Sequence, residues 1–539
     1  MRRWNGWGDD ATSMELNEGA RAMMAERLGP GHPGRDATRK QILKKIPASR
    51  LEGAHPLIQT DASTRFAMAL GESFADWIRK RFGALPPVPD GVAFVESTEQ
   101  VRELLDLAHA NNWMVIPFAG GTSVAGHLDC PISERPILSL NLSRMNRLLR
   151  LDKRSQLATF GAGTAGPQVE ALLREHGYTL GHFPQSFEYS TVGGWVVTRS
   201  SGQQSLRYGR IEQLFAGGRM ETPVGTMVLP TLPAASAGPD LRELVMGSEG
   251  RFGVLTEATV RITPVPEHES FHAVFLPDWD AAEGAVRTLV QRKLPLSMLR
   301  LSNAIETETN LTLAGHAKLI GWMERYLALR GCGKGKCMLM LGVTADQNTA
   351  RNALHEARRA LGEHGAVYIG TAMGSKWVAN RFKGPYLRNT LWDAGYSADT
   401  IETAVDWPQV KPLMLAMEQA SRDVFAEYGE RVHAFTHLSH MYPQGSSIYS
   451  QFVWATAPGG FAPNFERWQK LKAAVAQAIA DHGGTVSHQH GVGRDHATQL
   501  HVEKGPLGMA TLAGLCSHFD PQKIMNPGKL LQDEGPWAQ

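Results

Sequence analysis

The chain has 539 residues, which is too long for one hydrophobic core and predicts at least two lobes. Hydrophobic residues make up 42% and charged residues 20%, as in ordinary globular proteins, and the net charge of +2 argues against a broad nucleic-acid footprint. Four cysteines without a CxxC pair are too few for a disulfide framework. The chain shows no signal-peptide core and no apolar run that would span a membrane, so we expect a cytoplasmic protein.

An alternation of strands and helices begins after residues 1–88, a stretch that we predict to be mostly helical. Ser97 and Gln100 form a capping-box pattern at the start of a helix, and another helix ends at Gly177. The periodicity of apolar residues predicts strands at 92–95, 114–116, 137–140 and 157–160.

The pattern changes after Pro264-Val265-Pro266 to the order β-α-β-β-α-β, which is typical of a ferredoxin-like half-sheet. Residues 330–337 are rich in Gly and Lys and are expected to form an exposed loop. A last long helix over 465–479 ends at Gly483. The strands of the half-sheet are predicted at 273–276, 297–301, 338–343 and 367–370, and its helices at 281–291 and 348–361.

Several segments rich in glycine and hydroxyl residues indicate a site for a large, extended ligand. The segment Pro117-Phe-Ala-Gly-Gly-Thr-Ser-Val124 follows a predicted strand, and its paired glycines would let a phosphate approach main-chain N–H groups. An ordinary turn is the alternative for this segment alone, and neither a Rossmann nor a P-loop pattern opens a helix here. Similar segments at 185–202 and 246–257 favour the extended ligand.

These segments resemble the FAD domain of the vanillyl-alcohol-oxidase superfamily, and nearly the whole chain is similar to its alkylglycerone-phosphate synthase family. The similarity runs from Trp4-Asn-Gly-Trp-Gly8 through Val192-Gly-Gly-Trp195 and Gly247-Ser-Glu-Gly-Arg-Phe-Gly253 to Ser487-His-Gln-His-Gly491. It implies a two-lobed α+β fold with a PCMH-type FAD-binding domain and a ferredoxin-like antiparallel-sheet cap domain. The implied division is an N-terminal segment 1–88, an FAD-binding domain 89–268, a cap domain 269–487 and a C-terminal segment 488–539.

The resemblance implies that FAD is bound non-covalently, because relatives that attach FAD through the first loop carry a histidine where this chain has Thr122. The residues implied to cradle the pyrophosphate are Pro117, Phe118, Ala119, Gly120, Gly121, Thr122 and Ser123. Those implied to line the flavin and its linker are Gln185, Ser186, Phe187, Glu188, Tyr189, Ser190, Thr191, Thr198, Arg199, Ser200 and Ser201. Main-chain contacts are implied for Glu249, Gly250, Arg251, Phe252, Gly253, Val254 and Leu255.

Tyr449 lies in the apolar run 448–455, which predicts a strand with Gln451 on the same face. A buried tyrosine with one hydrogen bond is the structural alternative. The resemblance implies instead that Tyr449 is the general acid/base.

Three histidines are further catalytic candidates. His488 and His490 flank Gln489 in a turn, where two imidazoles could bind a metal or transfer protons near neutral pH. The family has three consecutive histidines at this position, whereas Gln489 cannot carry a proton. His182 matches a family histidine near the flavin.

Two arginines are candidates for binding the substrate. Arg388 matches the family arginine that binds the substrate phosphate, and a guanidinium fork suits phosphate or carboxylate. Arg300 matches a family arginine needed for cofactor retention and activity. A surface salt bridge is the alternative for either side chain.

Two histidine patterns could suggest a metal, but we predict none. His268-Glu-Ser-Phe-His272 fits a zinc-protease pattern that works only on a helix, whereas here it follows two prolines and enters a predicted strand. We interpret His433, His437 and His440 as part of a polar cavity wall.

The resemblance implies that the enzyme exchanges the acyl chain of acyl-dihydroxyacetone phosphate for a fatty alcohol through a flavin N5 adduct. The alternative is an FAD-dependent D-2-hydroxy-acid dehydrogenase of the lactate or glycolate type, which the C-terminal segment Asp520-Pro-Gln-Lys-Ile-Met-Asn-Pro-Gly-Lys529 resembles. For the synthase, the implied partners are a small-molecule or lipid substrate, a membrane surface in peripheral contact, and a second copy in a homodimer.

Overall fold

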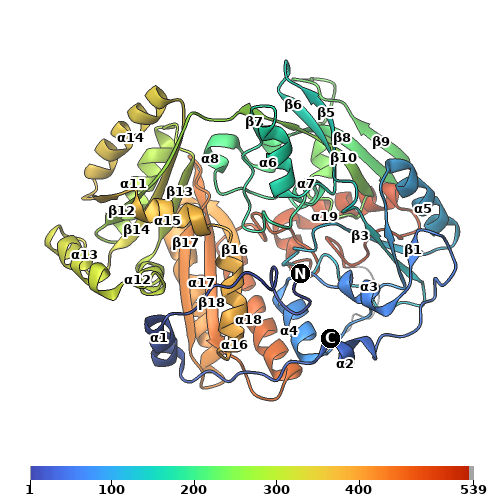
Figure 1. Ribbon diagram of the computed structural model, residues 1–539, viewed down its shortest axis with the longest axis horizontal. Helices are drawn as coiled ribbons and strands as arrows, with labels where there is room; N and C mark the ends of the chain where they lie inside the picture. The colour runs from blue at the N-terminus through green and yellow to red at the C-terminus, as the bar shows by residue number, and fades with distance from the viewer. Residues whose placement is uncertain (1, 533–539) are drawn as a thin grey trace.

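Two lobes lie side by side in the computed structural model, which describes residues 2–532 (Figure 1). The first lobe contains a four-stranded sheet in the order β1-β2-β4-β3 and a five-stranded antiparallel sheet in the order β5-β6-β10-β8-β9. The strands of the first sheet are β1 (Ile58–Gln59), β2 (Gly91–Phe94), β3 (Met114–Phe118) and β4 (Ile137–Asn141). Those of the second are β5 (Leu148–Asp152), β6 (Leu157–Gly161), β8 (Phe215–Thr222), β9 (Gly225–Leu229) and β10 (Val254–Arg261). All four strands predicted here are present.

Short helices and one small sheet complete this lobe. Ser97 caps α5 by accepting from the Gln100 N–H, but the Gln100 side chain accepts from Glu96 N–H and so does not close the predicted capping box. The helices are α5 (Thr98–Ala110), α6 (Gly166–Arg174), α7 (Val192–Val197), α8 (Ser205–Tyr208), α9 (Ile211–Leu214) and α10 (Arg242–Val245). Strands β7 (Tyr178–Thr179) and β11 (Thr263–Pro264) pair with each other.

The second lobe is built on one antiparallel sheet in the order β15-β12-β14-β13-β17-β18-β16. Its first four strands have the spatial order of a ferredoxin-like sheet, which confirms the predicted cap fold. The strands are β12 (His268–Leu276), β13 (Met298–Ser302), β14 (Cys337–Ala345), β15 (Val367–Gly370), β16 (Tyr396–Asp406), β17 (Val432–Leu438) and β18 (Gly445–Ala455).

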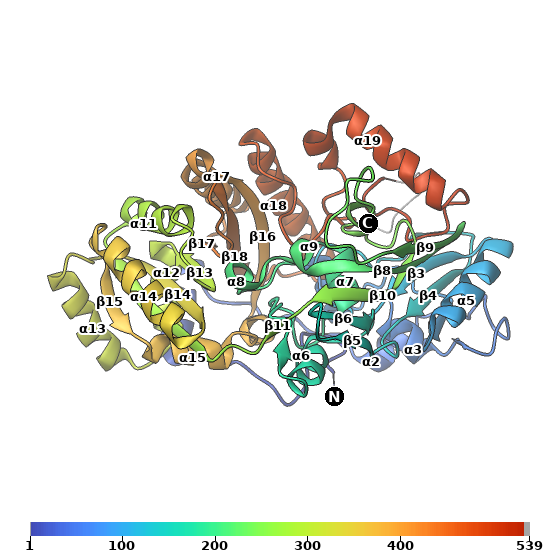
Figure 2. The ribbon, with the colours of Figure 1, turned by 90° about the horizontal axis from the view of Figure 1, so that it is seen from above.

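Four helices of the cap cover one face of this sheet (Figure 2). They are α11 (Trp279–Gln291), α14 (Gln347–Gly362), α17 (Trp407–Ala426) and α18 (Phe461–Asp481), and their apolar side chains form one core with alternate residues of the strands. The remaining cap helices are α12 (Ala304–Leu313), α13 (Ala317–Leu329), α15 (Ala372–Asn380), the 3-10 turn η1 (Gly384–Tyr386) and α16 (Leu387–Asp393). Neither α12 nor α13, which lie between β13 and β14, was predicted.

The N-terminal segment is less helical than the sequence predicts. Its helices are α1 (Glu18–Leu28), α2 (Arg39–Leu43), α3 (Ala62–Ala67) and α4 (Phe74–Phe82). Connections that contain two prolines each separate α1 from α2 and α2 from α3. The first residues cross from one lobe to the other. The Arg2 guanidinium donates to the Gly120 carbonyl oxygen over 2.7 Å, and the Trp7 main chain exchanges two hydrogen bonds with the Asn389 side chain.

The chain returns to the first lobe near its end. Helix α19 (Leu500–Phe519) is followed by a segment in which Ile524 accepts from the Val115 N–H of β3 over 2.7 Å, and Asn526 donates back to Val115 over 2.8 Å. The division of the chain at 88, 268 and 487 stays a prediction. Between residues 2 and 532, no helix is both long and apolar enough to cross a bilayer.

Candidate functional site

Three polar side chains form a row across adjacent strands of the cap sheet. Tyr449 of β18 lies directly opposite His437 of β17 on one side and Glu402 of β16 on the other. Because side chains alternate along a strand and Ile448 and Phe452 enter the helix-covered core, Tyr449 and its two neighbours lie on the opposite face. The row places a phenol between an imidazole and a carboxylate.

The Tyr449 ring is enclosed by histidines. It stacks on the His437 ring at 4.8 Å and meets the His490 ring edge-on at 5.7 Å. Its hydroxyl donates to the Thr400 Oγ1 atom over 3.1 Å. Burial raises the pKa of the Tyr449 phenol to about 12, so the group keeps its proton at neutral pH.

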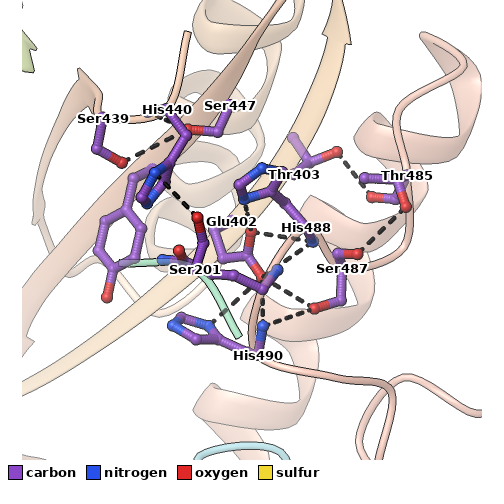
Figure 3. Close-up of polar contacts among 12 residues, drawn as sticks. Ser201, Glu402, Thr403, Ser439, His440, Ser447, Thr485, Ser487, His488 and His490 are labelled. Carbon is purple, nitrogen blue, oxygen red and sulfur yellow. Dashed lines mark hydrogen bonds and ion pairs between the residues drawn. The ribbon is translucent and has the colours of Figure 1, made fainter. Parts of the chain in front are cut away.

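Glu402 holds the turn that carries the catalytic histidine candidates (Figure 3). Its buried carboxylate accepts from the main-chain N–H groups of His488, Gln489 and His490 over 3.0, 3.0 and 3.1 Å, and from the Ser487 hydroxyl over 2.9 Å. One carboxylate therefore satisfies four donors and fixes the turn against β16. The sequence analysis missed Glu402, and no local pattern around it could have shown this role.

A second group of contacts fixes the orientation of the His488 ring. Arg210 donates to its Nε2 atom over 2.5 Å, and the Tyr442 hydroxyl lies 2.7 Å from the same atom. Since arginine has no acceptor, Nε2 must accept, and the ring proton is then on Nδ1, 3.6 Å from the Glu402 carboxylate. The His440 ring stacks on His488 at 5.2 Å. Arg210 and Tyr442 were not among the predicted site residues.

Burial holds the histidines near the site in their neutral form. It lowers the pKa of His182 to about 3, and lowers the pKa values of His437, His488 and His490 as well. These imidazoles are therefore acceptors and neutral N–H donors at neutral pH, and they lack the minor imidazolium fraction that an unperturbed histidine has there. His182 lies apart from the turn, with its Nε2 atom 3.2 Å from the Ser200 hydroxyl.

The two predicted substrate-binding arginines lie in different surroundings. Arg388 donates to the Glu72 carbonyl oxygen over 2.9 Å and lies 4.4 Å from the centre of the Trp77 ring. Its Nε and Nη2 atoms are buried and have no hydrogen-bond partner in residues 2–532, which suits an anionic ligand. Arg300 is instead bound to Glu306 over 2.7 Å and to His437 over 3.0 Å, so it supports the row of side chains around Tyr449.

The predicted cofactor segments contact one another and leave polar atoms without protein partners. A Cβ on Gly120 would lie 2.2 Å from the Tyr189 carbonyl oxygen, so the first loop packs on the second only with a glycine there. Gly121 has a φ of +65°, which the turn of the first loop itself requires. Buried atoms without a hydrogen-bond partner among the described residues include His182 Nδ1, Glu188 Oε2, Ser248 Oγ and Gln489 Oε1. Glycine cradles and free buried polar groups fit a large ligand such as FAD.

Many side chains in these segments have structural partners, which leaves the main chain and a few side chains to face a cofactor. Ser123 Oγ is 2.6 Å from His127 Nδ1, and the Glu249 carboxylate accepts from the Val492 and Gly493 N–H groups. Other side chains cap helices, join the core or tie the chain together: Phe187, Ser190, Thr191, Thr198, Arg199, Arg251 and Phe252. Gln185 is exposed and donates to the Arg381 carbonyl oxygen.

The remaining histidines do not gather into one site. His268 and His272 lie in strand β12, as predicted. His433 contacts Arg27 and Thr309 rather than the row around Tyr449, which corrects its interpretation as part of one cavity wall with His437 and His440. In the described part of the chain, no three His, Cys, Asp or Glu side chains are grouped as metal ligands.

The Glu402 contacts predict a local loss of stability when the carboxylate is neutralised. Glu402→Gln would present an amide N–H₂ to N–H donors, and we expect the turn to be destabilised by about 2 to 4 kcal/mol. Hydrogen exchange of a peptide covering residues 485–493 would then speed up, while Glu427→Gln, on the exposed Lys470 ion pair, should leave it unchanged. Unaltered exchange in Glu402→Gln would mean that other contacts hold the turn.

Known proteins are similar to this chain over both lobes. One family model, the FAD binding domain, matches residues 89–229, and another, FAD linked oxidases, C-terminal domain, matches 265–530. The alkyldihydroxyacetonephosphate synthase (another name for alkylglycerone-phosphate synthase) of Trypanosoma brucei brucei is 28% identical, and the similarity covers 98% of this chain and 92% of that protein. That of Dictyostelium discoideum is 27% identical, with 98% and 93% covered. A solved alkyldihydroxyacetonephosphate synthase structure superposes with a TM-score of 0.83 at 26% identity, covering 98% of this chain and 99% of that one.

Hydroxy-acid-oxidising relatives match less of the chain. Glycolate oxidase subunit GlcD of Bacillus subtilis is 24% identical over 82% of this chain and 89% of its own length. The alternative drawn from the C-terminal segment is therefore less well supported than the similarity that covers both lobes and the N-terminal segment.

Proposed function

This chain is an FAD-dependent enzyme of the vanillyl-alcohol-oxidase superfamily of FAD-linked oxidases, and within this superfamily we propose that it is an alkyldihydroxyacetonephosphate synthase. In the proposed reaction, the acyl chain of acyl-dihydroxyacetone phosphate leaves as a fatty acid and a fatty alcohol takes its place. The observation that carries the proposal is the similarity to synthases over 98% of the chain.

FAD, when bound, would supply the reacting flavin ring of this exchange. The residues proposed to hold it are the main-chain groups of 117–123, the segments 185–191 and 198–201, and the turn 249–255. Thr122 offers a hydroxyl where covalently linked relatives carry histidine, which supports a non-covalent cofactor.

Tyr449 is proposed to move the proton of the reaction at its phenolic oxygen. A phenol that keeps its proton at neutral pH can give it to a leaving group and later recover it from the incoming alcohol. The neutral imidazoles of His437 and His490 against its ring would shape the pocket and accept hydrogen bonds. Gln489, in place of the family histidine, can bind through its amide but cannot take part in proton transfer.

Arg388 is proposed to bind the substrate phosphate. Its two buried N–H-bearing atoms, which have no hydrogen-bond partner among the described residues, match the bidentate geometry of phosphate oxygens, and Trp77 keeps the planar group in place. Arg300, His182 and His488 are proposed to position the pocket rather than to hold the phosphate.

Three finer statements belong to the same proposal. Both substrates carry long alkyl chains, which supports peripheral contact with a membrane. A homodimer is proposed on the resemblance alone, and the cytoplasmic location expected from the sequence stays a proposal.

The position of the phosphate-binding loop can be tested at Thr122. Thr122→Asp would place a carboxylate beside the pyrophosphate, and repulsion of about 4 kcal/mol at roughly 4 Å would weaken FAD binding by about 10³-fold. The ratio of flavin to protein absorbance after gel filtration measures this, with Thr122→Asn as the uncharged control of the same shape. Full flavin occupancy in the aspartate variant would show that the loop lies elsewhere.

The reaction itself can be tested by anaerobic stopped-flow absorbance of the flavin-loaded protein. We expect bleaching of the oxidised flavin band by palmitoyl-dihydroxyacetone phosphate, and recovery on addition of a fatty alcohol without any electron acceptor. Bleaching by D-lactate or glycolate, with no response to the acyl ketone phosphate, would overturn the synthase and establish the dehydrogenase.

A further inference from the structure

One more buried imidazole, that of His440, lies among the histidines of the candidate site (Figure 3). His440 belongs to the connection between β17 and β18, and only 4% of its surface is exposed. Its ring stacks on the His488 ring at 5.2 Å, and it is close enough to His182 and His437 for their charges to affect its pKa. The ring therefore lies close to both the row around Tyr449 and the segments proposed to line the flavin.

Two serines of the first lobe hold the Nδ1 side of this ring. Ser201 Oγ is 3.2 Å and Ser205 Oγ is 3.1 Å from His440 Nδ1, and Ser201 belongs to a segment proposed to line the flavin. Neither hydroxyl makes another hydrogen bond within residues 2–532, so both can donate to Nδ1. The ring proton is then on Nε2, on the edge of the ring that faces away from the serines.

The main chain, and not the ring, fixes the connection that carries His440. The His440 N–H donates to Ser447 Oγ over 3.1 Å, and the His440 carbonyl oxygen accepts from the Ser447 N–H over 2.8 Å. Tyr442 and Gly445 close the turn with two main-chain hydrogen bonds to each other. The shape of the connection therefore does not explain why a buried, polar ring stands at position 440.

The surroundings make the His440 ring a neutral N–H donor. Burial lowers the pKa of His440 to about 3, and the charge of Arg210 acts in the same direction. The Gln489 side chain opposes this shift, as an acceptor oxygen beside a ring N–H does. Gln489 Oε1 is nevertheless buried without a partner at hydrogen-bond geometry among the described residues. A donor and an acceptor thus lie beside each other without satisfying one another, which suits a ligand atom at this place.

We propose that His440 donates from Nε2 to a negatively charged oxygen bound at the flavin, and so supplies the imidazole that the turn lacks at Gln489. A neutral N–H group that is held in place before the reaction stabilises charge that develops on a bound ligand. Ser201 and Ser205 hold the ring for this purpose from its other side. The inference deepens the proposed function, on which it rests for the place of the flavin.

Sulfite is a probe of this pocket that needs no substrate and no turnover. Its sulfur lone pair bonds to the flavin N5 atom, negative charge passes to the ring, and the oxidised flavin band is bleached. Titration of the flavin-loaded protein with sulfite gives a Kd, which is lower when N–H groups stabilise this charge. A wild-type protein that forms no adduct would contradict a pocket that stabilises an anion.

Two variants separate the roles of the two ring nitrogens. His440→Asn places an amide where Nδ1 was, so it keeps the contacts with Ser201 and Ser205 and loses the Nε2 donor. We expect its sulfite Kd to rise by about 10 to 100-fold with an unchanged unfolding temperature. His440→Gln places an N–H₂ group where Nε2 was, so its Kd should stay within about threefold of the wild type. A Kd in His440→Asn that is no higher than in His440→Gln would overturn the proposal, because the ring would then act through its serine contacts alone.

His433 provides the matched control, and Gln489 the rescue. His433 is also 4% exposed and contacts Arg27 and Thr309, so His433→Asn should leave the sulfite Kd unchanged. An equal rise in both asparagine variants would overturn the proposal. Adding Gln489→His to His440→Asn should lower the raised Kd by at least about fivefold, because an imidazole returns to the pocket. No recovery would show that positions 440 and 489 do not serve one ligand, and the inference would fail.

The sulfite Kd separates this inference from the proposed reaction. Unchanged affinity in the variants, together with exchange of the acyl chain by the wild type, would remove His440 and leave the synthase standing. The expected changes in affinity, in a protein that exchanges no acyl chain, would keep the role of His440 and remove the synthase.

Discussion

Replacing Tyr449 by phenylalanine is expected to lower the rate of alcohol exchange by about 10² to 10⁴-fold while the protein retains its FAD. The variant keeps the ring that stacks on His437 and meets His490, and loses only the hydroxyl that donates to Thr400. Steady-state rates with acyl-dihydroxyacetone phosphate and a fatty alcohol, together with the visible flavin spectrum, measure both parts of the expectation.

A tyrosine in the same sheet provides the control. Tyr396 of β16 is buried and donates to the Gly29 carbonyl oxygen over 2.8 Å, so Tyr396→Phe removes a comparable hydrogen bond away from the row. We expect this variant to be slightly less stable and fully active. Wild-type turnover in Tyr449→Phe would remove Tyr449 from the chemistry and leave it a structural residue.

Replacing Arg388 by methionine is expected to raise the KM for the phosphate-bearing substrate by roughly 10²-fold or more, with a smaller change in kcat. Methionine can keep the apolar contact with Trp77 but offers no N–H group to a phosphate. Arg388→Lys keeps the charge without the planar fork and should lie between the two.

A substrate that lacks the phosphate distinguishes a role of Arg388 in phosphate binding from a role in the structure around it. The methionine variant and the wild type should process acyl-dihydroxyacetone with similar kcat/KM, because this substrate carries no phosphate for Arg388 to bind. An equal loss on both substrates would mean that Arg388 supports the structure around Phe74 and Trp77 rather than the phosphate.

The strands and helices of the cap were largely predictable because they follow simple periodicities. Strand β15 was predicted at its observed limits, 367–370, and the six elements of the ferredoxin-like half appeared in the predicted order. Helix α13 was missed, and its burial explains why. It exposes Trp322 and Leu329 and fully buries only Leu327, so its apolar residues do not mark the side that faces the core.

The candidate site was predictable only in part. Tyr449, His488 and His490 could be named from the resemblance, but Glu402 could not, because its role depends on the pairing of β16 with β18 and on a turn 86 residues away. Strand register is set by contacts between distant parts of the chain, so no local pattern reveals that His437, Tyr449 and Glu402 are neighbours. The lowered histidine pKa values likewise arise from burial in the folded protein.

The register of β17 and β18 has a consequence for how this protein can change over generations. Residues 439–444 join the two strands, and a change in the length of this segment would displace His440 and Tyr442 from His488 but leave Tyr449 in place as long as the ladder itself is kept. A slip of one residue within the ladder would turn Tyr449 into the core beside Phe452 and bring Ile448 or Ser450 to the opposite face. Such a mutant would lose the packing of the core and also the Tyr449 hydroxyl from the site. Selection for a well-packed sheet therefore also preserves the position of Tyr449, because one strand register determines both.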